Sequence, residues 1–81
     1  MVKTAFVEDQ SRYRDLLRLI LTSSDEVALV FEKEHCRTII DDVVKAMPDV
    51  LIMDIDLPEK SGIDAVIEIK AVFPEIKILM L

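Results

Sequence analysis

The feature that most constrains the fold of this chain is a regular alternation between two hydrophobic periodicities. Short runs rich in apolar residues occur at Val2–Val7, Val27–Phe31, Val50–Met53 and Ile76–Leu81. Between these runs, apolar residues recur every three or four positions from Ser11 to about Leu21, from Ile39 to Met47 and from Ile63 to Phe73. The short runs are typical of buried strands, and the longer spacing is typical of amphipathic helices. This order predicts an α/β fold with a parallel sheet, right-handed crossovers and helices on both faces.

Prolines and the single glycine mark the boundaries of these segments. Pro48 ends the second helical segment and Pro74 ends the third. Residues 55–62 form a loop that holds Pro58 and Gly62. Pro58 fixes its own backbone angle, and we expect Gly62 to adopt a left-handed conformation before the third helix.

Size and composition indicate one small globular unit. The chain has 81 residues, of which 52% are hydrophobic and 32% charged, and this composition excludes a disordered chain. No apolar run reaches the ~18 residues that a bilayer span needs, and the first residues do not resemble a secretory signal, so we expect a cytoplasmic protein. The single cysteine, Cys36, excludes an internal disulfide, and we expect it and His35 at the surface or at a helix start. The net charge of −6 disfavours direct contact with nucleic acid.

Acidic residues follow two of the predicted strands at the point where each strand ends. Glu8 and Asp9 follow the first strand, and Asp54 follows the third. Ligands of open parallel sheets bind at the carboxyl ends of the strands, so neighbouring strands would bring three carboxylates together. Crowded carboxylates repel each other, and Mg²⁺, which prefers oxygen ligands, offsets that repulsion. Asp54 is then placed to attack a phosphoryl group. The alternative is that these acids are ordinary loop residues or caps, with Asp9 or Ser11 capping the first helix.

With these residues, the chain resembles the receiver domain of bacterial response regulators. The family pattern has an acidic pair after the first strand, here Glu8-Asp9, and a phosphoacceptor after the third, here Asp54. A proline four residues later and a glycine eight residues later also match, as Pro58 and Gly62. The resemblance implies a flavodoxin-like (CheY-like) fold with sheet order 2-1-3-4-5.

The resemblance also implies a metal site and a phosphodonor. Mg²⁺ would be held by Asp9, Asp54 and the backbone carbonyl of Asp56, with Glu8 helping through water. The phosphoryl group would come from a sensor histidine kinase and pass to Asp54. The resemblance further implies an output of the helix-turn-helix (LuxR/NarL-like) class, and contact with DNA only through such an output domain, absent from these residues.

The family pattern continues beyond the residues present here. It has a serine or threonine after the fourth strand and a lysine at the end of the fifth, and the sequence reaches Leu81 before either. We therefore expect residues 1–81 to be the N-terminal part of a receiver domain, with an incomplete sheet of four strands and three helices.

Two other interpretations compete with the receiver. The segment Asp54-Ile55-Asp56-Leu57 also resembles the nucleophile motif of haloacid-dehalogenase-type phosphatases, in which the first aspartate attacks and the second is a general acid. A structural alternative is a homodimer or swapped oligomer that associates through the fourth strand, because Ile76, Ile78, Leu79, Met80 and Leu81 would otherwise meet water.

Overall fold

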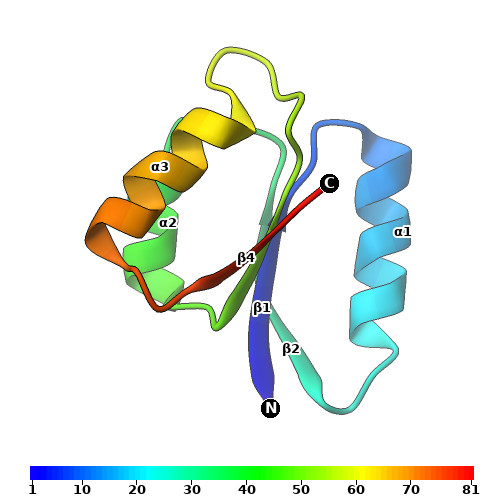
Figure 1. The fold of residues 1–81 in the computed structure, drawn as a ribbon. Coiled ribbons are helices and arrows are strands. Elements are labelled where there is room, and N and C mark those ends of the chain that lie inside the picture. Colours follow the sequence, from blue (N-terminus) through cyan, green and yellow to red (C-terminus); the bar gives the residue numbers. More distant parts are fainter.

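The computed structural model describes residues 1–81 as one four-stranded sheet with three helices (Figure 1). The strands are β1 (Val2–Val7), β2 (Val27–Lys33), β3 (Val50–Met53) and β4 (Lys77–Met80). The helices are α1 (Ser11–Thr22), α2 (Ile39–Ala46) and α3 (Gly62–Val72). All paired strands are parallel, and their order in the sheet is β2-β1-β3-β4. The predicted class and element order are confirmed, and the strand order agrees with the first four places of the expected 2-1-3-4-5.

Element boundaries differ from the predicted ones by a few residues. Strand β2 continues to Lys33, beyond the predicted end at Phe31, because Val7 at the end of β1 still pairs with Lys33. The register between β1 and β2 shifts once between Thr4 and Ala5. Helix α2 ends at Ala46, since Met47 adopts a left-handed conformation with φ of 45° before the proline.

The main hydrophobic core lies between the sheet and the pair α2 and α3, which cover the same face (Figure 1). It contains alternate residues of the central strands, such as Ala5 and Val7 of β1 and Leu51 and Met53 of β3. This alternation follows from the two-residue period of a strand. The helices contribute Ile39, Val43, Ala65 and Ile69.

Cys36 belongs to this core, so its predicted surface or capping position is wrong. Its side chain is fully buried, and its Sγ lies 3.3 Å from the Sδ of Met53. The segment before α2 turns inward at Cys36, whereas its neighbour His35 stays half-buried in the loop. The Nδ1 atom of His35 accepts a hydrogen bond from the backbone N–H of Arg37 at 3.3 Å.

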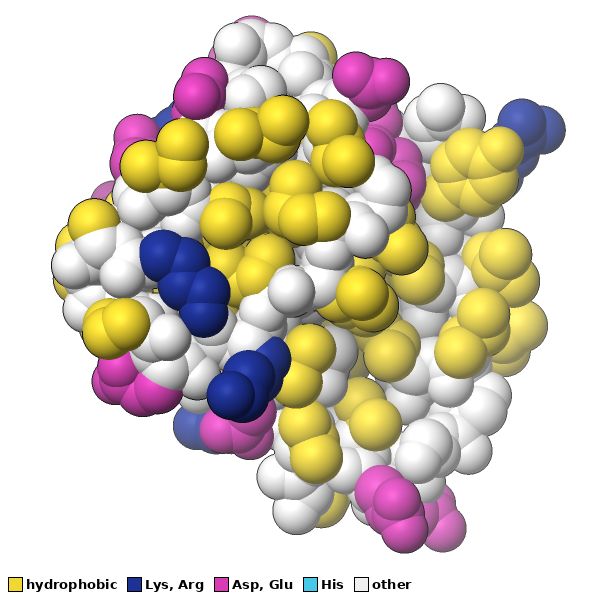
Figure 2. All heavy atoms as spheres, viewed as in Figure 1, with side chains coloured by type: hydrophobic (Ala, Val, Ile, Leu, Met, Phe, Trp, Pro, Cys, Tyr) yellow, Lys and Arg dark blue, Asp and Glu magenta, His cyan; other side chains and the backbone are white.

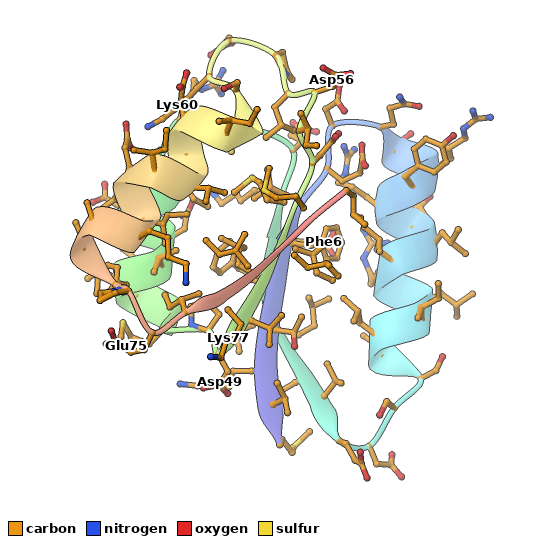
Figure 3. The ribbon with its side chains drawn as sticks, in the orientation of Figure 1. Phe6, Asp49, Asp56, Lys60, Glu75 and Lys77 are labelled. Carbon is orange, nitrogen blue, oxygen red and sulfur yellow. The ribbon has the colours of Figure 1, made fainter.

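The opposite face of the sheet is covered by α1 alone. Phe6 points from β1 toward this helix and is fully buried (Figure 3). Helix α1 nevertheless has no buried residue, and Leu16 and Ile20 of its predicted apolar stripe are more than half exposed. A single α-helix covers only the strands directly beneath it, and α1 packs mainly against β2.

Strand β4 forms one edge of the sheet and pairs only with β3. The sequence predicted that all five apolar residues from Ile76 to Leu81 would meet water. The structure corrects this, because Ile76 is buried, whereas Leu79 and Leu81 are more than half exposed. Figure 2 shows hydrophobic side chains gathered across the face on which β4 lies in front. None of the three helices combines the length and the apolar character that a bilayer-spanning helix needs.

Candidate functional site

The pairing of β1 with β3 sets the position of the candidate site. Val7 pairs with Met53 at the carboxyl ends of these strands, and the backbone N–H of Asp54 donates to the carbonyl of Val7 at 3.1 Å. The residues that follow each strand therefore emerge at the same edge of the sheet. One carboxylate oxygen from each of Glu8, Asp9 and Asp54 lies within 4.8 Å of the others. The predicted convergence of these three carboxylates is confirmed.

Glu8 is the most buried member of this acidic cluster, with 7% of its surface exposed. Its Oε2 accepts a hydrogen bond from the backbone N–H of Gln10 at 3.0 Å. Burial is the main cause that raises the pKa of the Glu8 carboxyl, and the neighbouring charge of Asp54 raises it further. The hydrogen bond from Gln10 acts in the opposite direction and does not cancel these effects. The cluster therefore holds negative charge against an unfavourable environment.

No lysine or arginine forms an ion pair with the carboxylates of this cluster. All six ion pairs of the structure involve other acids, so Glu8, Asp9 and Asp54 have no lysine or arginine partner. Three close carboxylates without an ion-pair partner form a donor set that suits a hard divalent ion with oxygen ligands. The residues therefore fit the Mg²⁺ that the sequence predicted.

Asp9 does not cap helix α1, and neither does Ser11. The N-cap residue is Gln10, and no side chain forms a capping hydrogen bond there. Helix α1 begins at Ser11, which is therefore already inside the first turn, while the carboxylate of Asp9 joins the acidic cluster. The capping interpretation of Asp9 is wrong.

Asp56 lies in the loop at the same end of the sheet (Figure 3). Its side chain is exposed and is not part of the acidic cluster. Its backbone N–H donates to the Oδ1 of Asp54 at 3.1 Å, which holds one carboxylate oxygen of Asp54 in a fixed direction. The assignment of the Asp56 carbonyl as a metal ligand stays a prediction.

Gly62 has a different role from the one expected. Its backbone is not left-handed, and the loop residue with positive φ is Glu59, at 67°. A Cβ atom at residue 62 would lie 2.0 Å from the carbonyl oxygen of Asp54. Glycine is therefore required because the start of α3 packs directly on the backbone of Asp54. The preceding residue, Ser61, caps α3 by accepting from the backbone N–H of Asp64 at 3.2 Å.

Charged loop residues surround the acidic cluster without joining it. Lys60, in the loop after Asp54, pairs with Glu68 of α3. Arg37 donates to both carboxylate oxygens of Glu59, at 2.8 and 3.0 Å, and so links the β2–α2 loop to the β3–α3 loop. A hollow of about 270 Å³ lies between these loops, lined by Asp9, Glu34, His35, Arg37, Pro58 and Glu59.

The residue that sequence reasoning missed is Arg14. Its Nη1 donates to the backbone carbonyls of Glu8, at 3.0 Å, and of Asp9, at 2.7 Å. Arg14 sits in the first turn of α1, five residues after Asp9. Only this short spacing could have drawn attention to it, because one arginine on a helix is usually a solvated residue.

Comparisons with known proteins agree with this geometry. Residues 5–81 match the family described as "Response regulator receiver domain". The transcriptional regulatory protein DegU of Brevibacillus brevis is 28% identical over 80 residues, which are 99% of this chain and 34% of DegU. The chain therefore spans about a third of the length of this curated relative.

Solved receiver structures superpose closely on the fold. The isolated REC domain of RcsB from Salmonella enterica serovar Typhimurium, determined with the phosphomimetic BeF3-, gives a TM-score of 0.89 at 26% identity. The response regulator domain of Thermotoga maritima CheB gives a TM-score of 0.90 at 25% identity. The match covers 98% of this chain for RcsB and 99% for CheB, and 59% of each solved chain.

Proposed function

The chain belongs to the response regulator receiver domain family, and on this premise we propose that residues 1–81 are the N-terminal part of a receiver that accepts a phosphoryl group on Asp54. The observation that carries the proposal is the convergence of Glu8, Asp9 and Asp54 within 4.8 Å, with no protein cation paired to them. The donor is a sensor histidine kinase, which supplies the group from a phosphohistidine.

The chemistry needs little covalent work from the protein. A carboxylate oxygen of Asp54 forms the bond to phosphorus while the bond from phosphorus to the histidine nitrogen breaks, and the imidazole leaves. Asp9, Asp54 and the Asp56 carbonyl would hold Mg²⁺, with Glu8 contributing through water. When bound, Mg²⁺ supplies the positive charge that screens the phosphoryl group from the carboxylates. Asp56 contributes independently, because its N–H orients Asp54 Oδ1 and leaves the other oxygen of that carboxylate to attack.

The proposed activity is a single transfer to the protein's own aspartate and not turnover of an external substrate. The phosphatase alternative required Asp56 to act as a general acid beside Asp54. The Asp56 side chain is exposed and stands outside the acidic cluster, which favours the receiver. Steady release of phosphate from a generic phosphomonoester would instead support the phosphatase.

The direct test is phosphorylation by a small donor. The chain is incubated with Mg²⁺ and acetyl phosphate, and intact-mass spectrometry follows a base-labile phosphoryl adduct. We expect the adduct on the wild type, none on Asp54→Asn, and none without divalent ion. An adduct that persists in Asp54→Asn contradicts the proposal. The matched control is Asp56→Asn, which keeps the proposed carbonyl ligand and should still be labelled.

The output and surroundings of this receiver are also proposals. The name of the transcriptional regulatory protein DegU and a solved structure of RcsB bound to a promoter support a role in transcription regulation, with a helix-turn-helix output domain as the part that would contact DNA. A protein-glutamate methylesterase of Methanococcus maripaludis is 36% identical over 80 residues, so similarity to this chain is not restricted to transcriptional regulators. We place the protein in the cytoplasm, where the transmitter part of a sensor kinase would meet it.

A second candidate, for the 81-residue chain studied on its own, is self-association through β4. Leu79 in β4 and Leu81 just after it are 54% and 56% exposed, and β4 pairs with β3 only. Unpaired strand edges with apolar side chains favour strand addition by another copy or a swap of elements. Light scattering of the chain at micromolar concentration tests this, and a stable monomer would contradict it. The variant Leu79→Lys should shift the protein toward monomer.

A further inference from the structure

Arg14 is connected to the acidic pair in an unusual way, through backbone atoms and not through carboxylates. Its guanidinium Nη1 donates to the carbonyl oxygens of Glu8 and Asp9 at 3.0 and 2.7 Å. Its Nη2 lies 3.3 Å from Oε2 of Glu34 in the loop after β2. The side chain is 18% exposed, so this arginine is largely enclosed by the groups that it binds.

We propose that Arg14 is a positioning residue that holds the backbone of Glu8 and Asp9 in the conformation that lets their carboxylates share one metal ion with Asp54. The inference rests on the proposed function and adds a residue to its machinery. Arg14 itself does not touch the reacting atoms.

Few other contacts hold this turn in place. The backbone N–H of Glu8 donates to the carbonyl of Lys33 at 2.9 Å, which fixes only the point where β1 ends. The N–H of Gln10 donates to the Glu8 side chain and not to a backbone acceptor. The carbonyls of Glu8 and Asp9 point to Arg14, so without it both would have to find water. The direction of each carboxylate depends on these backbone angles.

An arginine suits this task better than a lysine does. The guanidinium is planar and carries several donors in a fixed arrangement, so two carbonyls and one carboxylate are bound in one geometry. A lysine has one mobile ammonium group and cannot reproduce that arrangement. The Glu34 carboxylate holds the other side of the guanidinium, and thereby ties the acidic turn to the loop after β2.

Charge and geometry predict opposite effects for the removal of Arg14. A cation beside the cluster repels a divalent ion, so charge alone predicts that Arg14→Ala binds Mg²⁺ more tightly. Positioning predicts weaker binding, because carboxylates on a loosened turn no longer converge. Groups that orient metal ligands typically contribute 10- to 100-fold to metal affinity. The ion pair with Glu34 offsets part of the repulsion, and we expect positioning to dominate.

The experiment is a calorimetric Mg²⁺ titration of the 81-residue chain, without a phosphodonor, at a temperature well below unfolding. We expect Arg14→Ala to lose about tenfold in affinity, and Arg14→Lys to lose less than the alanine variant but more than a factor of two. The matched control is Arg12→Ala on the same helix turn, whose guanidinium contacts only the Tyr13 side chain, with its central carbon 5.0 Å from the ring centre. This control should bind Mg²⁺ as the wild type does.

Backbone amide NMR of the metal-free protein gives the second readout. We expect Arg14→Ala to broaden or shift the amides of residues 8–10 while those of the β3–α3 loop stay in place. Wild-type or tighter Mg²⁺ affinity in Arg14→Ala overturns the inference. If Arg14→Ala does not fold, Arg14→Lys decides, and wild-type affinity in that variant has the same meaning. Absence of Mg²⁺ binding by the wild type would instead contradict the proposed function.

Discussion

Gly62 packs against the backbone of Asp54 so closely that a Cβ atom at residue 62 would lie 2.0 Å from the Asp54 carbonyl oxygen and 3.1 Å from the Cγ of Met53. The start of α3 thus rests directly on the residue that we propose as phosphoacceptor. Backbone atoms cannot move aside as a flexible side chain can, so any larger residue must displace either the helix or Asp54.

Gly62→Ala should therefore destabilise the fold and disturb the site together. Overpacking of this kind costs ~3 kcal/mol in the free energy of unfolding. Urea denaturation measures the loss, and Mg²⁺ titration at low urea measures the damage to the site. The control is Ser61→Ala, which removes the α3 cap at a cost of ~1 kcal/mol and should leave Mg²⁺ affinity near that of the wild type. Equal stability of Gly62→Ala and the wild type would mean that the start of α3 can shift away from Asp54 with no loss in the free energy of unfolding.

Glu8→Gln should raise the melting temperature without divalent ion and reduce the stabilisation that Mg²⁺ gives. The raised pKa of the buried Glu8 carboxyl means that its favourable contribution is present below its ordinary value of 4.5 and is lost as pH rises through the folded value. At pH 7 without divalent ion, we therefore expect Glu8→Gln to melt above the wild type. With saturating Mg²⁺ the wild type should gain more than the variant, because it regains a partner for its charge.

Thermal melts at pH 7 in EDTA and in Mg²⁺ measure both effects. In EDTA, the difference in melting temperature between Glu8→Gln and the wild type should vanish near pH 4. Glu75→Gln is the matched control, since Glu75 is exposed and lies at the opposite end of the sheet (Figure 3). A wild type that is more stable than Glu8→Gln even in EDTA would contradict the predicted charge penalty.

Cys36 should be unreactive in the folded chain. Burial raises the pKa of its thiol from 9.0 to about 11, which lowers the thiolate fraction at pH 8 by about 100-fold. The side chain is also closed to reagents, because it is fully buried against Met53. We expect a disulfide reagent such as DTNB to label it slowly in buffer and rapidly in concentrated urea. Rapid labelling under native conditions would show that the segment before α2 opens readily.

The ion pair between Arg18 and Glu32 should give stability that depends on pH. Arg18 Nε donates to Oε2 of Glu32 at 2.7 Å, and this hydrogen bond is the main cause that lowers the pKa of Glu32. A lowered pKa adds stability above the ordinary value of 4.5, and that stability is lost as pH falls through the folded value.

The variant Arg18→Gln should therefore melt below the wild type at pH 7, and the difference should shrink as pH falls toward 3. The effect should be small, because both side chains keep contact with water. Arg12→Gln serves as the control. A difference that stays constant over the whole pH range would assign the effect to packing of the arginine stem and not to the ion pair.

The fold was largely predictable because the strands and the helices each have a hydrophobic periodicity that is visible in the sequence. The continuous apolar run Val50–Met53 indicated a strand covered on both faces, and Pro48 and Pro74 marked the ends of the helices on either side. Given a parallel sheet, the residues after β1 and β3 had to meet at one edge, so the convergence of Glu8, Asp9 and Asp54 followed from topology.

What sequence could not predict depends on contacts between distant segments. The burial of Cys36 arises where the loop before α2 meets β3, and no local pattern encodes that meeting. The role of Gly62 was misassigned because glycine serves both positive φ and close approach, and only the position of the Asp54 carbonyl separates them. Arg14 was missed because its partners are carbonyl oxygens, which every residue carries.

The acidic cluster forms only when β1 and β3 pair in the native register. Thr4 pairs with Val50 and Val7 with Met53, and this ladder joins segments that are far apart in the sequence. A slip of one residue would turn Asp54 to the other face of the sheet. A chain that has not yet paired these strands, or has paired them in the wrong register, does not bring the three carboxylates together and would not be phosphorylated on Asp54. On the proposed function, phosphorylation of Asp54 is thereby confined to correctly assembled molecules.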